Sequence, residues 1–185
     1  MLKPKPKPKP INNEIKLSDK QYIVSRTDTL GVIEYGNDYF HEICGYSKAE
    51  LLGKPHNIIR HPDMPKVLFK LMWERINKGE DIRAIVKNLA KDGSYYWVVT
   101  EFEPKIDPVT NKILSHTAFR RHVPQRAINT IAPIYKKLLE IEKEQNVQAS
   151  EAYLVEFLEK NNTTYDEYIE KLIAKKGIFK RLMRL

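Results

Sequence analysis

Residues 56–65 hold the densest group of side chains that could bind a small molecule. They read His-Asn-Ile-Ile-Arg-His-Pro-Asp-Met-Pro, which places two imidazoles, a guanidinium, an amide and a carboxylate between apolar runs. Pro62 favours an extended backbone before it, and Pro65 is tolerated in a first helical turn. We therefore predict a loop that leads into a helix from Met64 to Asn77, with Asp63 as its cap. Such a loop suits an anion or a cofactor, and an ordinary helix start with surface charges is the alternative.

The elements that must position this loop follow from the alternation of apolar and polar residues. Short β-rich runs at 22–26 and 32–35 flank a turn at Asp28-Thr29-Leu30-Gly31, and short helices are expected after Asn37 and Ser47. Three further strands are predicted at 82–89, 95–105 and 113–122. This order predicts an α+β fold, with one antiparallel sheet and helices packed on one face.

Several segments together resemble a PAS sensor domain. They are residues 28–37, 45–55, 86–93 and 96–98, and the resemblance covers about residues 20–135. More narrowly, the 56–65 loop, the Lys87-Asn88 pair and Ile131-Ala132-Pro133-Ile134-Tyr135 resemble the flavin-binding PAS domain of bacterial aerotaxis receptors. This resemblance implies the PAS fold, with a five-stranded antiparallel sheet and helices on one face.

The resemblance also implies FAD as the cofactor. Arg60 would then fork onto phosphate or ribose oxygens, beside the N-terminus of the following helix. The carboxamide of Asn88 offers a donor and an acceptor to the edge of the flavin ring. Trp97 is more often a core residue than a ligand contact. The predicted cofactor-binding residues are His56, Asn57, Arg60, His61, Asp63, Asn88 and Trp97.

One position departs from the family. The strand that leads into Val86-Lys87-Asn88 usually carries a tryptophan that packs on the flavin, whereas this chain has Ile82 there. Ring stacking is therefore either lost or supplied by another element.

Composition divides the chain into three parts. Residues 1–14 include a Lys-Pro repeat that favours extended geometry, and we expect this segment to be disordered. Residues 15–124 form the predicted PAS domain, and 125–185 a helical C-terminal extension that ends in a basic tail. The net charge of +8 arises mainly from four lysines in residues 3–10 and five basic residues in 175–185. The body between them is nearly neutral, which argues against nucleic-acid binding.

These observations favour a sensor over an enzyme. The chain has no P-loop, no GxSxG motif and no spacing for a closed zinc site, so we expect no turnover chemistry and no metal. Lone Cys44 fits a reducing cytoplasm, and no apolar run is long enough to span a membrane.

The leading hypothesis is a cytoplasmic redox or energy sensor in the stand-alone form of the aerotaxis receptor family, without transducer domains. Its partner would be a membrane-bound methyl-accepting transducer or another chemotaxis signalling protein. A homodimer and peripheral membrane association through the basic tail are further expectations. The alternative is a PAS interaction module that acts as an adaptor, with an empty or haem-binding pocket.

Overall fold

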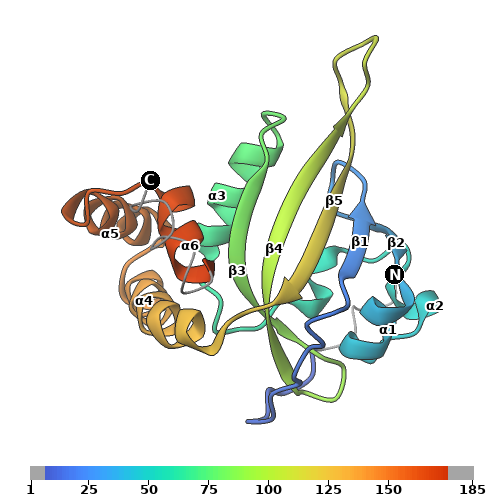
Figure 1. The fold of residues 1–185 in the computed structure, drawn as a ribbon, viewed down its shortest axis with the longest axis horizontal. Coiled ribbons are helices and arrows are strands. Elements are labelled where there is room, and N and C mark those ends of the chain that lie inside the picture. Colours follow the sequence, from blue (N-terminus) through green and yellow to red (C-terminus); the bar gives the residue numbers. More distant parts are fainter. Residues whose placement is uncertain (1–6, 175–185) are drawn as a thin grey trace, which may run out of the picture.

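Five strands form one antiparallel sheet in the order β2-β1-β5-β4-β3 in the computed structural model, which describes residues 7–174 (Figure 1). The strands are Ile23–Thr27 (β1), Ile33–Gly36 (β2), Ile82–Leu89 (β3), Tyr95–Ile106 (β4) and Ile113–His122 (β5). Their bounds match the sequence prediction to within a residue or two, and the predicted five-stranded antiparallel sheet is confirmed. The β4–β5 hairpin extends beyond the rest of the sheet (Figure 1).

Four short helical elements lie between β2 and β3 in the sequence. They are α1 (Asp38–Cys44), α2 (Lys48–Leu51), the 3₁₀ helix η1 (His56–Ile59) and α3 (Lys66–Ile76). The Asn37 side chain accepts a hydrogen bond from the Phe40 N–H at the start of α1, and Ser47 with Glu50 forms a capping box on α2. Both helix starts were predicted from these residues.

The start of α3 differs from the prediction. Pro65 occupies the N-cap position, and the Asp63 carboxylate pairs with the Lys87 ammonium at 2.7 Å instead of capping the helix. The Glu142 carboxylate accepts hydrogen bonds from the backbone N–H groups of Lys66 and Val67, both at 2.8 Å. The prediction that Asp63 caps the helix is wrong, because a residue 75 positions away from Val67 supplies the acceptor.

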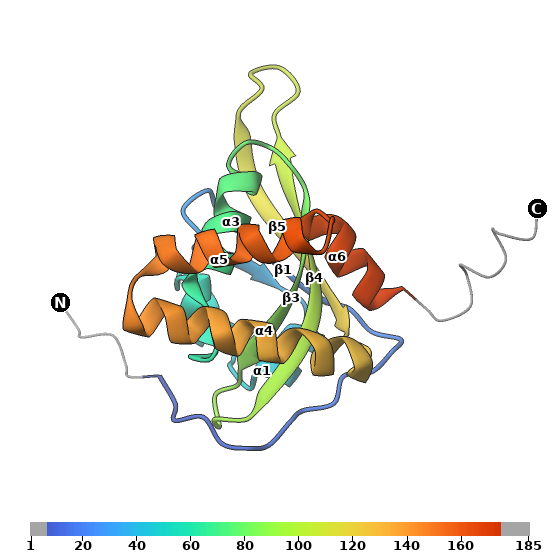
Figure 2. The same ribbon diagram turned by 90° about the vertical axis from the view of Figure 1, so that its left-hand side faces the viewer.

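The predicted helical C-terminal extension is confirmed as far as the described residues reach. It consists of α4 (Gln125–Glu144), α5 (Val147–Lys160) and α6 (Tyr165–Ile173), which gather on the β3 side of the sheet beside α3 (Figures 1 and 2). Ion pairs join α3 to two of these helices, from Lys70 to Glu151 at 2.5 Å and from Arg75 to Asp166 at 3.1 Å. With Glu142, all three extension helices are tied to α3 by polar contacts.

The extension and the 56–65 loop also cover the free edge of β3. The Tyr135 hydroxyl on α4 donates to the Ile85 carbonyl oxygen at 2.8 Å, and the Lys87 N–H donates to the Met64 sulfur at 3.2 Å. Arg60 forms a β-bridge to Asn88. Within residues 7–174, no helix combines the length and apolar character that a membrane span requires.

The N-terminal segment is ordered over the part that the structure describes. The Ile11 N–H donates to the Gly93 carbonyl oxygen at 2.9 Å, and Glu14 forms a parallel bridge with Tyr95 at the start of β4. The segment passes around one end of the sheet (Figure 2). Residues 11–14 thus differ from the expected disorder, because backbone groups of Gly93 and Tyr95 pair with this stretch. Residues 1–6 and the basic tail, 175–185, lie outside the described residues.

Candidate functional site

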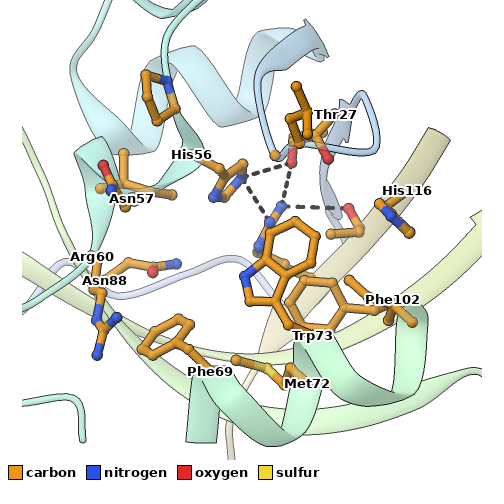
Figure 3. Close-up of a pocket in the computed structure, with 18 of the residues that line it drawn as sticks. Thr27, His56, Asn57, Arg60, Phe69, Met72, Trp73, Asn88, Phe102 and His116 are labelled. Carbon is orange, nitrogen blue, oxygen red and sulfur yellow. Dashed lines mark hydrogen bonds between the residues drawn. The ribbon is translucent and has the colours of Figure 1, made fainter. Parts of the chain in front are cut away.

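A cavity of about 400 Å³ lies between the sheet and the helical elements η1 and α3 (Figure 3). Its floor comes from alternate residues of β1 and β5, together with Asn88 of β3 and Phe102 of β4. Residues of α3 form the facing wall, and the β1–β2 turn and η1 close the remaining side. This volume falls in the range of cofactor sites.

A buried hydrogen-bond cluster occupies one wall of the cavity. Arg120 on β5 is only 2% exposed, and its guanidinium donates to the Ser25 Oγ and the His56 Nε2, both at 2.9 Å. Because a guanidinium can only donate, the His56 Nε2 must be the acceptor, which leaves the ring proton on Nδ1. Burial, reinforced by Arg120, lowers the pKa of His56 to about 3, so this imidazole is neutral at physiological pH.

Arg120 has no compensating carboxylate among residues 7–174. Burial lowers its pKa to about 10, which still leaves it charged at neutral pH. None of the side chains that line the cavity in this part of the chain is acidic, whereas Arg60 and Lys70 add two more cations. A buried charge without a partner is costly, so the cavity is suited to a ligand that carries or acquires negative charge.

Asn88 brings an unsatisfied amide to the same cavity. The residue is 4% exposed, and its Nδ2 has no hydrogen-bond partner among the described residues. Arg60 lies beside it through the β-bridge, with its guanidinium 3.7 Å above the Phe69 ring centroid and donating to the Met64 carbonyl oxygen at 3.2 Å. The polar residues at this end therefore leave an amide donor available to a ligand.

The α3 wall is aromatic. Trp73 projects across the cavity, with Phe69 and Met72 beside it on the same helix (Figure 3). Gly31 in the β1–β2 turn has φ +80°, and a Cβ built there would lie 2.9 Å from the Trp73 ring. Glycine at this position thus permits both the turn and the close approach of the indole. Ile82, at the position where the resemblance to aerotaxis receptors implies a tryptophan, is 3% exposed and belongs to the core.

The structure brings four of the seven predicted site residues together. The four that line the cavity are His56, Asn57, Arg60 and Asn88. The other three, His61, Asp63 and Trp97, do not line it.

These three residues lie on the far side of the loop and sheet. The His61 Nδ1 accepts a hydrogen bond from the Asp63 N–H at 3.1 Å, and burial, followed by the charge of Lys87, lowers the pKa of His61 to about 4. Trp97 points from the opposite face of β4 and stacks on Tyr135 of α4, with centroids 6.4 Å apart. With Lys87, Asp63 and Trp97 border a second cavity under α4. Their positions indicate roles in holding the loop and the extension.

Sequence reasoning did not select Arg120, Ser25, Trp73 or His116 as site residues. Strand alternation places His116, Ala118 and Arg120 on one face of β5, but the other face is also mixed in polarity. The sequence therefore indicated that these residues share a face of β5, but it did not indicate which face is buried.

Comparisons with known proteins agree with this architecture. Residues 33–113 match the family described as PAS fold. The aerotaxis receptor of Escherichia coli is 39% identical over 122 residues, which are 66% of this chain and 24% of that protein. The bacterioopsin transcriptional activator of Halobacterium salinarum is 28% identical over 104 residues, 56% of this chain and 15% of that protein. The chain thus spans a quarter or less of the length of these relatives.

A solved structure supports the fold. The structure of an RNA-binding light-oxygen-voltage receptor matches with a TM-score of 0.51 at 14% identity, and the match covers 66% of this chain and 33% of that one. At this identity the likeness concerns the arrangement of strands and helices alone.

Proposed function

Since this chain contains a PAS sensory domain related to that of the aerotaxis receptor, we propose that it binds FAD and senses cellular redox or energy state. The cavity beneath α3 is the proposed binding site. The proposed role is binding and signalling without turnover. The likeness to the aerotaxis receptor suggests this function, and the chemistry of the cavity supports it independently.

The main support for the proposal is the buried guanidinium of Arg120, which has no acidic partner among the described residues. A flavin, when bound, supplies reversible electron uptake that adds negative charge to its ring system. Arg120 would stabilise that charge without any movement, because its position is already held by Ser25 and His56. The free amide of Asn88 supplies a donor to the polar edge of the ring.

Two further features fit a flavin. Trp73 on α3 offers the flat apolar surface that Ile82 on β3 lacks, so stacking would come from the opposite wall of the cavity. Arg60, at the cavity border, is placed to contact phosphate, as the family resemblance implies. Arg60→Ala should therefore weaken FAD retention about ten- to a hundredfold, the worth of a charge-assisted hydrogen bond.

The visible spectrum of the purified full chain tests the proposal. Flavin bands, with FAD released on denaturation at near one equivalent per chain, would support it. A Soret band would identify haem, and a spectrum without bands would favour the adaptor alternative, which the loss of the tryptophan at position 82 suggests.

Substitution of Arg120 then tests whether its buried charge acts on the flavin. In flavin-loaded protein, Arg120→Gln should lower the midpoint potential by roughly 60 mV or more, the equivalent of one charge-assisted hydrogen bond in a one-electron step. Arg121→Gln is the matched control, because Arg121 follows on the opposite face of β5. Equal potentials in both variants would remove Arg120 from the site.

We further propose that the signal leaves through a separate membrane-bound methyl-accepting transducer or another chemotaxis protein. The α4–α6 extension is the proposed route, since it contacts both α3 and the edge of β3. The proposed location is cytoplasmic, with recruitment to the membrane through residues 175–185. Co-sedimentation with transducer-containing membranes, before and after deletion of that tail, checks this part.

A further inference from the structure

The cavity meets the solvent beside η1. Among the described residues that line it, the three exposed ones are Leu30, Pro55 and Asn57, and they belong to the β1–β2 turn and to the segment that forms η1. The floor and the α3 wall consist of buried or half-buried residues. A ligand therefore enters and leaves past η1, which makes this short turn the entrance of the cavity.

The entrance turn is fixed to the fold at its two ends. Before it, the His56 N–H donates to the Gly31 carbonyl oxygen at 2.9 Å. After it, Arg60 forms the β-bridge to Asn88. Between these points, the Asn57 carbonyl oxygen accepts from the Arg60 N–H at 3.0 Å. A single 3₁₀ turn has poor hydrogen-bond geometry, so its closed position depends on contacts from other segments.

The N-terminal segment supplies such a contact. The Lys7 ammonium donates to the Asn57 carbonyl oxygen at 2.5 Å and to the Arg60 carbonyl oxygen at 3.3 Å. A cation at the C-terminal end of a helical turn offsets the partial negative charge of the last carbonyl groups. Partial burial of the ammonium, followed by the charge of Arg60, lowers the pKa of Lys7, so the contact depends on these two acceptors.

The same segment is anchored elsewhere on the fold. The Ile11 N–H donates to the Gly93 carbonyl oxygen in the β3–β4 turn, at 2.9 Å, and the segment passes around one end of the sheet (Figure 2). Pro8 and Pro10 restrict the backbone between this anchor and Lys7. Residues 7–14 therefore form a stiff strap that joins the β3–β4 turn to the entrance of the cavity.

We propose that this strap gates the cavity, with Lys7 as the residue that keeps η1 closed. The inference rests on the proposed flavin function only for the choice of ligand. Lys7 contacts backbone atoms of the entrance in the protein without ligand, so its loss should make opening more frequent whether the cavity is empty or filled. Entry and exit should then accelerate by the same factor, and the equilibrium affinity should stay nearly unchanged.

Stopped-flow binding of FAD to full-length protein stripped of flavin tests the gate. In Lys7→Met, which keeps the aliphatic stem without the charge, the association and dissociation rate constants should both rise about three- to tenfold, the factor of one hydrogen bond at an exposed position. Lys7→Arg should keep the slow rates, because a guanidinium also donates. Lys9→Met is the matched control, since Lys9 is exposed and belongs to the same Lys-Pro repeat, and its rates should equal those of wild type.

Hydrogen exchange without flavin gives an independent measurement. The Arg60 N–H, which donates to Asn57 within the entrance turn, should exchange about three- to tenfold faster in Lys7→Met than in wild type. The same amide should be unchanged in Lys9→Met. Amides of β4 and β5 should exchange equally in all variants, because the core is not altered.

The outcomes separate this inference from the proposed function. Wild type that binds no FAD refutes the proposed function, and the exchange measurement still decides the role of Lys7. Equal exchange of the Arg60 amide in wild type and Lys7→Met overturns the gate, as do equal rates of FAD binding. A loss of affinity in Lys7→Met with an unchanged association rate would show that Lys7 acts on the ligand directly, which also overturns the gate.

Discussion

Replacing Glu142 by alanine should destabilise the N-terminal turn of α3, although Glu142 belongs to another helix. Its carboxylate accepts from the Lys66 and Val67 N–H groups at 2.8 Å each, and no side chain of α3 replaces it as a cap. Loss of a cap with its favourable helix-dipole interaction should lower the free energy of unfolding by about 2 kcal/mol. For a chain of this size the corresponding fall in Tm is roughly 5 °C.

Urea unfolding of the full chain measures this effect. Glu142→Gln should fall between wild type and Glu142→Ala, because the amide retains one acceptor oxygen without the charge. Glu144→Ala, an exposed glutamate on the same helix, is the control and should be nearly neutral. Hydrogen exchange at the Lys66 and Val67 amides should accelerate only in the Glu142 variants. Equal stabilities for Glu142→Ala and Glu144→Ala would refute the interhelical cap.

Three further predictions address the cavity. The unfolded His56 imidazole binds a proton below its ordinary pKa near 6.5, whereas the folded one stays neutral down to about 3, so stability should fall as pH drops through this window. His56→Gln should flatten the fall, which amounts to roughly 5 kcal/mol in wild type. An unchanged pH profile of urea midpoints would contradict this. Gly31→Ala should destabilise by about 1–3 kcal/mol through its positive φ and the Trp73 contact. Gly53→Ala should cost less, because Gly53 also has a positive φ of +72° but a Cβ there would meet no atom within 4 Å, and equal losses would show that Trp73 adds nothing. Asn88→Ala should shift the midpoint potential of bound flavin while most flavin is retained; an unchanged potential at full occupancy would place Asn88 outside the ring contact.

Much of the fold follows from the sequence because its local signals agree with one another. The alternation in 82–89 and 113–122, and the capping pairs Ser47-Glu50 and Thr164-Glu167, act within a few residues. The structure keeps each of these elements. The spacing of the apolar residues in 128–141 indicates a helix with one apolar face, but it carries no information about the surface that covers this face.

The site was harder to predict because it depends on contacts between distant segments. Arg60 and His61 are neighbours in sequence, yet Arg60 lines the cavity beside Asn88 and His61 does not. An irregular loop has no repeating pattern of residues from which this difference could be predicted. Trp97 has the strand parity of Lys87, its partner on β3, and therefore faces away from Asn88. Arg120 was not selected as a site residue, because its contacts are with Ser25 and His56, which are far from it in sequence.

The covered edge of β3 affects how the domain can be cut from its chain. Among the described residues, Tyr135 donates to the outward Ile85 carbonyl oxygen, and Met64 accepts from the outward Lys87 N–H. A fragment that ends at residue 124 would keep the whole sheet but lose Tyr135, leaving a strand edge open to pairing with another molecule. Such a fragment should self-associate or aggregate where the longer chain does not. The extension thus keeps the edge of β3 covered, and a fragment for expression should include α4.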